Sequence, residues 1–342
     1  MTRTWVRLPN WLGDLVAVLP VLDALVERGD DLTLALPRAH AGWVAERIPS
    51  ARIQPLQGNA RSSDAAGHDL ALLFDGSWRS ARAAWGAGVA RRIGWARGGR
   101  GPLLTTAITP AREIGGLPIG LGRIGRRPRW LPRPFGSAAV ELAGYAGIPV
   151  AHRVPELRPS AEVQAAVRSR STDLGIDPAA PFVLANVGAR PDSAKGWPPE
   201  SWRRLLKIVK ESAPVLLTCG PGEEDATSAL AREVGASAYV SPPASVMELA
   251  ALGELARVCV ATDGGARHVL RAGGARTVTL IGPTDPRHTA EHLVGDVRIR
   301  ETVPCGPCHL ELCPIAGSGH HLCMTSLSIS DVAQAVRAGL TG

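Results

Sequence analysis

Residues Val258–Pro286, VCVATDGGARHVLRAGGARTVTLIGPTDP, decide the fold class of this chain. The apolar run Val258–Ala261 predicts a buried strand, Asp263-Gly264-Gly265 a glycine turn, Ala266–Ala272 a helix and Val278–Ile281 a second strand. In such a unit the turn lies at the carboxyl edge of a parallel sheet, where backbone N–H groups and a helix amino terminus favour a phosphate. The alternative is an ordinary strand-to-helix turn in which Asp263 caps the helix.

The composition indicates a globular α/β chain. Its 342 residues are 45% hydrophobic, enough for two domains with cores of their own. No apolar run approaches the ~20 residues of a membrane helix, and the amino terminus lacks a signal-peptide layout. We therefore expect a cytoplasmic protein without a transmembrane segment. Arginine, alanine and glycine are all abundant, as is typical of a GC-rich genome, so the number of arginines is by itself weak evidence for nucleic-acid binding. We expect no nucleic-acid partner.

Positive charge is concentrated in one segment. Between Arg91 and Arg133 the chain has ten arginines and one acidic residue, Glu113, against a net charge of +7 for the whole chain. This predicts one local basic surface that could face phosphates, carboxylates or an anionic membrane.

The first half alternates strands and helices. Predicted strands are Thr4–Leu8, Leu32–Leu36, Ile53–Leu56, Leu70–Phe74 and Arg91–Trp95, and predicted helices are Leu15–Val26, Trp78–Ala87 and Ala138–Ala146. Residues 96–136 are rich in Gly, Pro and Arg, and we expect long loops there. The pattern predicts a mainly parallel sheet.

The second half repeats this architecture after a proline-rich linker at Pro149–Pro159, which places the domains at residues 1–155 and 156–342. Predicted strands are Phe182–Val187, Val215–Thr218, Tyr239-Val240, Val258–Ala261 and Val278–Ile281, and predicted helices are Glu162–Leu174, Glu200–Glu211 and Ala266–Ala272.

Candidate catalytic groups follow predicted strands in both halves. Asp14 stands where the first helix begins, either as a helix cap or as a general base at the sheet edge. Lys195 is one of only three lysines in the chain and suits a diphosphate leaving group, although most lysines are merely solvated. The first turn has no Gly-x-Gly-x-x-Gly, which argues against a dehydrogenase, and no Walker loop is present.

Several motifs together resemble one family. The motifs are Arg7-Leu8-Pro9-Asn10-Trp11-Leu12-Gly13-Asp14, Arg92-Ile93-Gly94, the segment from Gly188 to Pro199 around Lys195-x-Trp197, Asp263-x-Gly265-x-x-His268 and Gly282-Pro283-Thr284-Asp285-Pro286. Their order and spacing are similar to those of the ADP-heptose:lipopolysaccharide heptosyltransferases of glycosyltransferase family 9, heptosyltransferase II type. The resemblance covers essentially the whole chain.

The resemblance implies a GT-B fold, with two Rossmann-like domains facing across a cleft, and inverting transfer of a heptose from an ADP-sugar to the lipopolysaccharide inner core at the cytoplasmic face of the inner membrane. It implies Asp14 as the base and Lys195 at the leaving diphosphate, with no cofactor required for catalysis. The expected donor contacts are Gly188, Lys195, Glu223, Glu224, Asp263, Gly264, Gly265, His268, Thr284 and Asp285. For the acceptor we expect Asn10, Arg91, Arg92, Arg97 and Arg100.

Two departures from the family pattern stand out. Gly264 occupies a position where the family usually has threonine, which removes a hydroxyl and keeps the backbone amides. Arg-Pro-rich residues 126–134 replace a histidine-containing segment, which puts the identity of the acceptor in doubt.

A cysteine cluster, Cys305-x2-Cys308-x4-Cys313-x9-Cys323, lies near the carboxyl end with His309, His320 and His321 beside it. In a cytoplasmic protein four such cysteines favour thiolate ligation, with structural zinc ahead of an iron–sulfur cluster. Reduced free thiols are the alternative. Cys219 and Cys259 lie in apolar strands and are expected in the core.

Two other functions remain open at this point. The scaffold could serve another nucleotide-sugar enzyme, either a transferase with a different donor or an epimerase. It could also be a catalytically silent binding protein, although the presence of both Asp14 and Lys195 favours an enzyme.

Overall fold

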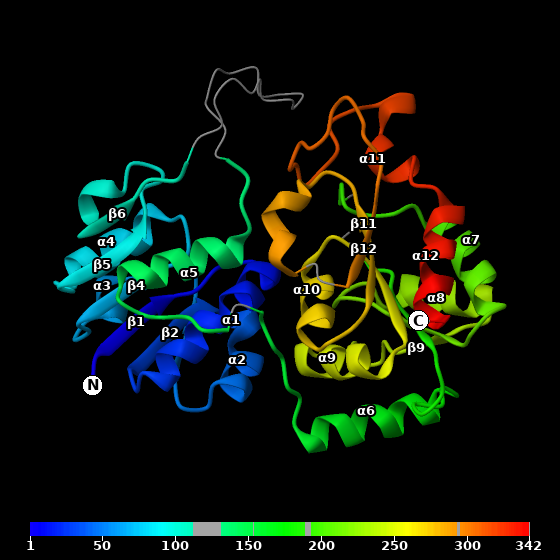
Figure 1. Ribbon diagram of the computed structural model, residues 1–342, viewed down its shortest axis with the longest axis horizontal. Helices are drawn as coiled ribbons and strands as arrows, with labels where there is room; N and C mark the ends of the chain where they lie inside the picture. The colour runs from blue at the N-terminus through cyan, green and yellow to red at the C-terminus, as the bar shows by residue number, and fades with distance from the viewer. Residues whose placement is uncertain (112–130, 153, 189–192, 293–294, 342) are drawn as a thin grey trace. The chain divides into compact units, whose positions relative to one another are not determined.

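The computed structural model describes residues 1–111, 131–152, 154–188, 193–292 and 295–341. The chain divides into two compact units, with the boundary between Glu156 and Leu157 and with Arg287–Glu291 grouped with the first unit. Each unit is a parallel sheet flanked by helices (Figure 1).

The first unit has a six-stranded sheet in the order β3-β2-β1-β4-β5-β6, and every pairing is parallel. Its strands are β1 Arg3–Arg7, β2 Asp31–Pro37, β3 Arg52–Leu56, β4 Leu70–Leu73, β5 Arg91–Trp95 and β6 Thr106–Ile108. Its helices are α1 Leu12–Glu27, α2 Ala41–Arg47, α3 Ser62–Ala65, α4 Trp78–Gly86 and α5 Phe135–Tyr145, with 3-10 turns η1 Arg38–His40 and η2 Gly101–Leu103. The order reverses between β1 and β4, as in doubly wound nucleotide-binding folds.

The second unit repeats this topology. Its sheet has the order β12-β11-β10-β7-β8-β9, again all parallel, and reverses between β7 and β10. Its strands are β7 Val183–Asn186, β8 Val215–Thr218, β9 Ser237–Ala238, β10 Val258–Thr262, β11 Thr277–Ile281 and β12 Asp296–Arg300. Its helices are α6 Ala161–Asp173, α7 Pro199–Lys210, α8 Glu224–Val234, α9 Val246–Leu255, α10 Gly265–Ala272, α11 Leu322–Thr325 and α12 Ile329–Thr341, with the 3-10 turn η4 Gly317–Gly319. The 3-10 segment η3, Pro286–His292, begins and ends in the second unit, and its middle residues are grouped with the first.

The cores explain why these elements form. Strands β4, β10 and β11 are buried along their whole length, because parallel strands are covered on both faces. Strand β4 therefore reads as a continuous apolar run, whereas β11 contains two buried threonines, Thr277 and Thr279. In the first unit, α1 buries ten residues and contacts α5. In the second, Trp197 and Trp202 pack edge to face at 5.1 Å within the core cluster that also holds α12.

Three expectations need correction. Residues 96–136 are not all loop, because they contain η2 and the edge strand β6; residues 112–130 lie outside the described part. The strand expected at Tyr239-Val240 is β9, two residues earlier. Strand β12 and helix α12 were not foreseen. No helix among the described residues is long and apolar enough to cross a membrane.

Candidate active site

In the second unit, the expected donor residues gather at the carboxyl edge of the sheet. Gly188 follows β7, Glu223 lies between β8 and α8, Asp263 follows β10 and Thr284 follows β11. Because these strands are parallel, their carboxyl ends share one edge, and Gly188 and Asp263 flank the point where the strand order reverses. Ligands of doubly wound folds bind at that point.

Gly188 and Glu223 form one wall of this edge. A Cβ atom at Gly188 would overlap the Glu223 carboxylate and lie 3.1 Å from the Gly220 nitrogen, so a larger residue here would displace the Glu223 side chain. The Glu223 carboxylate accepts a hydrogen bond from the Gly220 N–H at 2.8 Å. Burial raises the pKa of Glu223. Glu224, in the first turn of α8, has a lowered pKa because backbone N–H groups bond its carboxylate.

Asp263 is tied into a buried ion network. Arg267, four residues on and fully buried, lies 3.2 Å from Asp263 and 3.0 Å from Asp296 through its two terminal nitrogens. Thr277 and Thr279 donate to the other oxygen of Asp296 at 2.5 and 2.7 Å. On its other side, Asp263 accepts a hydrogen bond from the Thr284 hydroxyl. Asp263 therefore joins the β10 turn to the β11 turn. Asp285, next to Thr284, is buried.

The glycine turn leaves the start of α10 without a side-chain cap. The N-cap residue is Gly264, which makes no side-chain cap hydrogen bond, so the alternative of Asp263 as the N-cap does not hold. The space around a Cβ at Gly264 is open, with the nearest atom 3.9 Å away. His268 is buried on α10, with its Nε2 3.4 Å from an Arg267 nitrogen.

Lys195 lies in a half-buried segment held by backbone contacts. Its N–H donates to the Ser193 hydroxyl at 3.3 Å, and the preceding Ala194 N–H donates to the Glu311 carbonyl at 2.8 Å. Gly265, the first residue of α10, is half-buried as well.

In the first unit, Asp14 lies in the first turn of α1, half-buried, and is not the N-cap residue, which is Trp11. Asn10 is exposed, and its side-chain oxygen accepts a hydrogen bond from Arg7 at 2.6 Å. Arg7 in turn lies 3.4 Å from Asp75, a carboxylate whose pKa is raised by burial. This chain of contacts holds the turn between β1 and α1.

The expected acceptor arginines divide into two groups. The first group, Arg91, Arg92 and Arg97, is exposed or half-buried, but only Arg97 follows the carboxyl end of β5, the sheet edge that also carries Asn10. Arg91 and Arg92 begin β5 at the opposite edge and donate to the Ala146 and Leu103 carbonyls at 3.2 and 2.7 Å, so we correct their role from acceptor contacts to structural ones. Arg100, by contrast, is fully buried, lies 3.4 Å from Asp75 and donates to the Trp95 and Ser77 carbonyls at 2.7 and 3.0 Å. We therefore correct its role from an acceptor contact to a structural ion pair.

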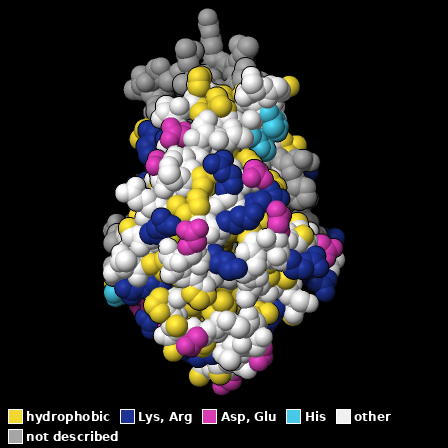
Figure 2. Space-filling model, turned by 90° about the vertical axis from the view of Figure 1, so that its right-hand side faces the viewer, with side chains coloured by type: hydrophobic (Ala, Val, Ile, Leu, Met, Phe, Trp, Pro, Cys, Tyr) yellow, Lys and Arg dark blue, Asp and Glu magenta, His cyan; other side chains and the backbone are white. Residues whose placement is uncertain are grey.

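The basic surface is only partly described. Five arginines of the predicted run, at positions 112, 123, 126, 127 and 129, lie outside the described residues. Arg133 is ion-paired to Glu141 at 2.5 Å and stacks over the Trp95 ring. The face shown in Figure 2, at the side where α7, α8 and α12 lie in Figure 1, carries both signs of charge interspersed, with ion pairs such as Arg337–Glu211 at 3.7 Å.

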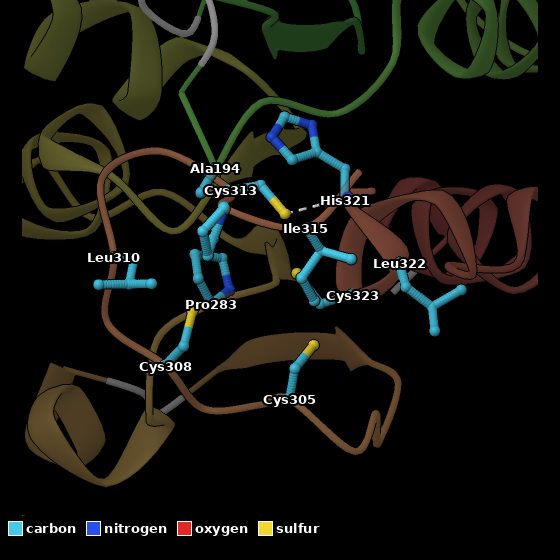
Figure 3. Close-up of a pocket in the computed structure, with 11 residues that line it drawn as sticks. Ala194, Pro283, Cys305, Cys308, Leu310, Cys313, Ile315, His321, Leu322 and Cys323 are labelled. Atoms are coloured by element: carbon cyan, nitrogen blue, oxygen red, sulfur yellow. Dashed lines mark hydrogen bonds between the residues drawn. The ribbon is translucent and has the colours of Figure 1, made fainter. Parts of the chain in front are cut away.

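The four clustered cysteines line one pocket, together with Ala194 and Pro283 (Figure 3). Among the residues that the structure describes, the group of metal-ligating atoms lying within 4.8 Å of one another is Cys313, His320 and His321. Of the four predicted cysteine ligands, only Cys313 belongs to this group. Cys219 and Cys259 are buried, as expected for core residues.

A family model for "Glycosyltransferase family 9 (heptosyltransferase)" matches residues 137–317. This is more than half of the chain. The chain belongs to glycosyltransferase family 9. The matched residues of this family 9 chain include every expected donor contact, from Gly188 to Asp285, whereas Asp14 and the acceptor arginines lie outside the match.

Individual relatives agree with the family. Lipopolysaccharide heptosyltransferase 1 of Pseudomonas aeruginosa is 31% identical over 138 residues, which are 40% of this chain and 39% of that relative, so the alignment spans well under half of either protein. The structure of ADP-heptose lps heptosyltransferase II of E. coli has a TM-score of 0.73 at 19% identity, covering 99% of this chain and 98% of that one. E. coli heptosyltransferase WaaC with ADP-2-deoxy-2-fluoro heptose has a TM-score of 0.64 at 17% identity, covering 98% and 99%. These structures confirm the predicted fold of two Rossmann-like domains.

Sequence reasoning missed the residues that hold this site together. Arg267 and Asp296 fix Asp263, and Arg7 and Asp75 fix Asn10. The spacing of Asp263 and Arg267, four residues apart across the start of α10, was a usable signal. No local signal pairs Arg267 with Asp296 or Arg7 with Asp75, because each pair joins distant segments.

Proposed function

We propose that this family 9 chain transfers a heptose from ADP-L-glycero-D-manno-heptose to the lipopolysaccharide inner core, with inversion at the anomeric carbon. The observation that carries the proposal is that one family match spans all the expected donor residues, which gather at one edge of the second sheet. The relatives support the donor, since one is a lipopolysaccharide heptosyltransferase and another was solved with an ADP-heptose analogue.

In the proposed reaction Asp14 is the general base. The acceptor hydroxyl oxygen forms a bond to the anomeric carbon while its proton passes to the Asp14 carboxylate. The bond from that carbon to the diphosphate oxygen breaks, and its electron pair leaves with ADP. The location of Asp14 in the first turn of α1, after the turn held by Arg7 and Asn10, supports this role.

The leaving diphosphate gains negative charge on its bridging oxygen. We assign its stabilisation to the Lys195 ammonium and to the Gly265 backbone amide at the start of α10, since the Gly264 amide, the other expected donor, bonds the Thr262 carbonyl at 2.7 Å. With these groups in place the transfer requires no metal ion of its own. Gly188, Glu223 and Glu224 are proposed contacts of the nucleoside, and Asp263, His268, Thr284 and Asp285 of the sugar and phosphates.

For the acceptor we propose Asn10 with Arg97, which both follow the carboxyl ends of strands in the first sheet. Guanidinium groups bind carboxylates and phosphates well, and an inner-core acceptor offers both. An acceptor of this kind places the reaction at the cytoplasmic face of the inner membrane, with the enzyme associated peripherally.

Ligand screening tests this proposal. ADP and ADP-heptose should raise the melting temperature of the protein, whereas UDP, GDP and NAD at the same concentration should not. A shift with UDP or GDP alone would favour a transferase or an epimerase with another nucleotide-sugar donor. Binding of ADP-heptose without transfer to any acceptor would favour a silent binding protein.

A further inference from the structure

The cysteine loop, residues 305–323, lacks a core of its own. Residues 305–322 are all exposed or half-buried, and the loop's regular structure before α11 is the 3-10 turn η4. The two non-glycine residues with positive φ among the described residues, His309 at 57° and His321 at 52°, both lie here. A segment with so little buried surface needs a cross-link to hold one conformation.

The loop contains a compact set of metal-ligating atoms. The Cys313 sulfur and ring nitrogens of His320 and His321 lie within 4.8 Å of one another. Tetrahedral bonds of about 2.3 Å from zinc to sulfur and about 2.0 Å to nitrogen would hold these atoms about 3.3–3.5 Å apart, so metal binding would contract the cluster. One sulfur and two imidazoles are ligands that favour zinc or iron over magnesium or calcium.

Neighbouring contacts orient these ligands. The His320 Nδ1 lies 2.8 Å from the Ile315 carbonyl, so it carries the proton and leaves Nε2 with a lone pair for a metal. The Cys313 sulfur accepts a hydrogen bond from the His321 backbone N–H at 3.3 Å, which fixes the position of that sulfur beside the two imidazoles. Cys305, Cys308 and Cys323 line the same pocket (Figure 3), and each could supply a further thiolate.

We propose that the cysteine loop binds one zinc-class metal ion through Cys313, His320 and His321, with one thiolate from Cys305, Cys308 or Cys323 as the fourth ligand. Each ligating thiol loses its proton to solvent as the metal–sulfur bond forms. The ion is structural, because four protein ligands leave no open position for a substrate.

The loop also supports both turns of the proposed donor site. Leu312 pairs with Ser193 in an antiparallel bridge, and the Glu311 carbonyl accepts from Ala194, the neighbour of Lys195. The His309 N–H donates to the Pro283 carbonyl at 2.9 Å, next to Thr284. If the proposed function holds, the bound ion therefore positions Lys195 and Thr284 for the donor.

Elemental analysis of the full chain, purified without added metal, tests the site. Wild-type protein should contain about one equivalent of zinc or iron, and Cys313→Ser and the double variant His320→Gln/His321→Gln should contain almost none. Cys259→Ala removes a buried thiol outside the pocket, and His152→Gln removes an exposed histidine; both should keep the full equivalent. Metal-free wild type that also fails to take up zinc would overturn the proposal.

A second measurement identifies the ligands in the wild-type protein, so its result does not depend on whether the variants fold. In cobalt-substituted wild type, the charge-transfer and d–d bands should report a tetrahedral site with two thiolates. Bands typical of four thiolates would overturn the assignment of the two imidazoles. The same conclusion would follow if the histidine double variant kept its metal while Cys305→Ser and Cys308→Ser both lost theirs.

The link to the donor is tested apart from catalysis. Metal removal should weaken ADP binding about 10-fold, as is usual for coupled sites, and re-addition of zinc should restore it. Equal ADP affinity of metal-bound and metal-free protein would refute the coupling. If the protein bound metal but never bound ADP, the proposed function would fail while the metal site remained.

Discussion

Asp14 and Lys195 carry the proposed chemistry, and each can be tested by removing one functional group. Asp14→Asn keeps the size and hydrogen bonding of the side chain but cannot accept a proton at neutral pH. We expect ADP affinity to stay at the wild-type value and kcat to fall about 10²–10⁴-fold. Isothermal titration and a steady-state assay measure the two quantities. A decrease in kcat of less than about 10-fold would show that Asp14 serves only the helix terminus.

Lys195→Ala should weaken donor binding and slow turnover together, because in the proposed mechanism the ammonium contacts the diphosphate both before and during bond cleavage. The matched control is Lys207→Ala, since Lys207 is exposed in the last turn of α7. The control should keep wild-type KM and kcat. Unchanged ADP affinity and kcat in Lys195→Ala would rule out the assigned role.

Arg267 illustrates what residue types alone do not reveal. Sequence reasoning expects arginine at the surface, yet Arg267 and Arg100 are fully buried beside carboxylates from distant segments. Their burial depends on partners that only the assembled sheet brings together. The position of Asp263 in a turn after a buried strand, in contrast, was predictable, because an apolar run followed by Asp-Gly-Gly is a strong local signal for a strand and a turn.

Arg267→Met should destabilise the second unit by about 3–5 kcal/mol, because it leaves Asp263 and Asp296 buried without a counter-charge. Denaturant unfolding measures the effect. Arg203→Met, at a partly exposed ion pair with Glu233, is the control and should change the unfolding midpoint little. A midpoint for Arg267→Met equal to that of the control would mean that the buried network is dispensable.

At the scale of elements, helix α10 packs closely on α9 through a glycine. A Cβ at Gly273 would lie 2.5 Å from the Ala250 carbonyl oxygen and 2.9 Å from its Cα. Gly273→Ala should therefore destabilise the protein by about 1–3 kcal/mol. Gly144→Ala, in α5 with open space around the new atom, should be neutral or stabilise by up to about 1 kcal/mol. Thermal unfolding of both variants distinguishes an effect of packing from an effect of helix propensity. If Gly144→Ala alone destabilised the protein, the close packing of α10 on α9 at Gly273 would not be the cause.

Buried strands were predictable and edge strands were not. Leu70–Leu73 and Val258–Thr262 are continuous apolar runs, so their positions follow from the sequence to within a residue. Thr106–Ile108 has three residues between Gly-, Pro- and Arg-rich stretches, and Asp296–Arg300 is mostly exposed and alternates charged with apolar residues. Such short or polar strands gain their stability from pairing with a neighbour, which no local pattern records.

At the scale of the molecule, both units have the same strand order, and each presents candidate residues after the strands where that order reverses. In the first unit these are Asn10 and Asp14, and in the second Gly188 and Asp263. This duplication was foreseen from the alternation of strands and helices. The proposed metal ligands were foreseen only in part, because His320 and His321 approach Cys313 through the fold of a loop that has no periodic pattern.

The central claim is heptose transfer from an ADP-linked donor. The most direct test incubates the wild-type chain with ADP-L-glycero-D-manno-heptose and a heptose-free inner-core acceptor, without added divalent ions, and analyses the product by mass spectrometry and NMR. We predict one heptose added per acceptor with inverted anomeric configuration and one ADP released per transfer. Asp14→Asn should form the product about 10²–10⁴-fold more slowly. Transfer from a UDP- or GDP-sugar but not from ADP-heptose, or a product with retained configuration, would contradict the account.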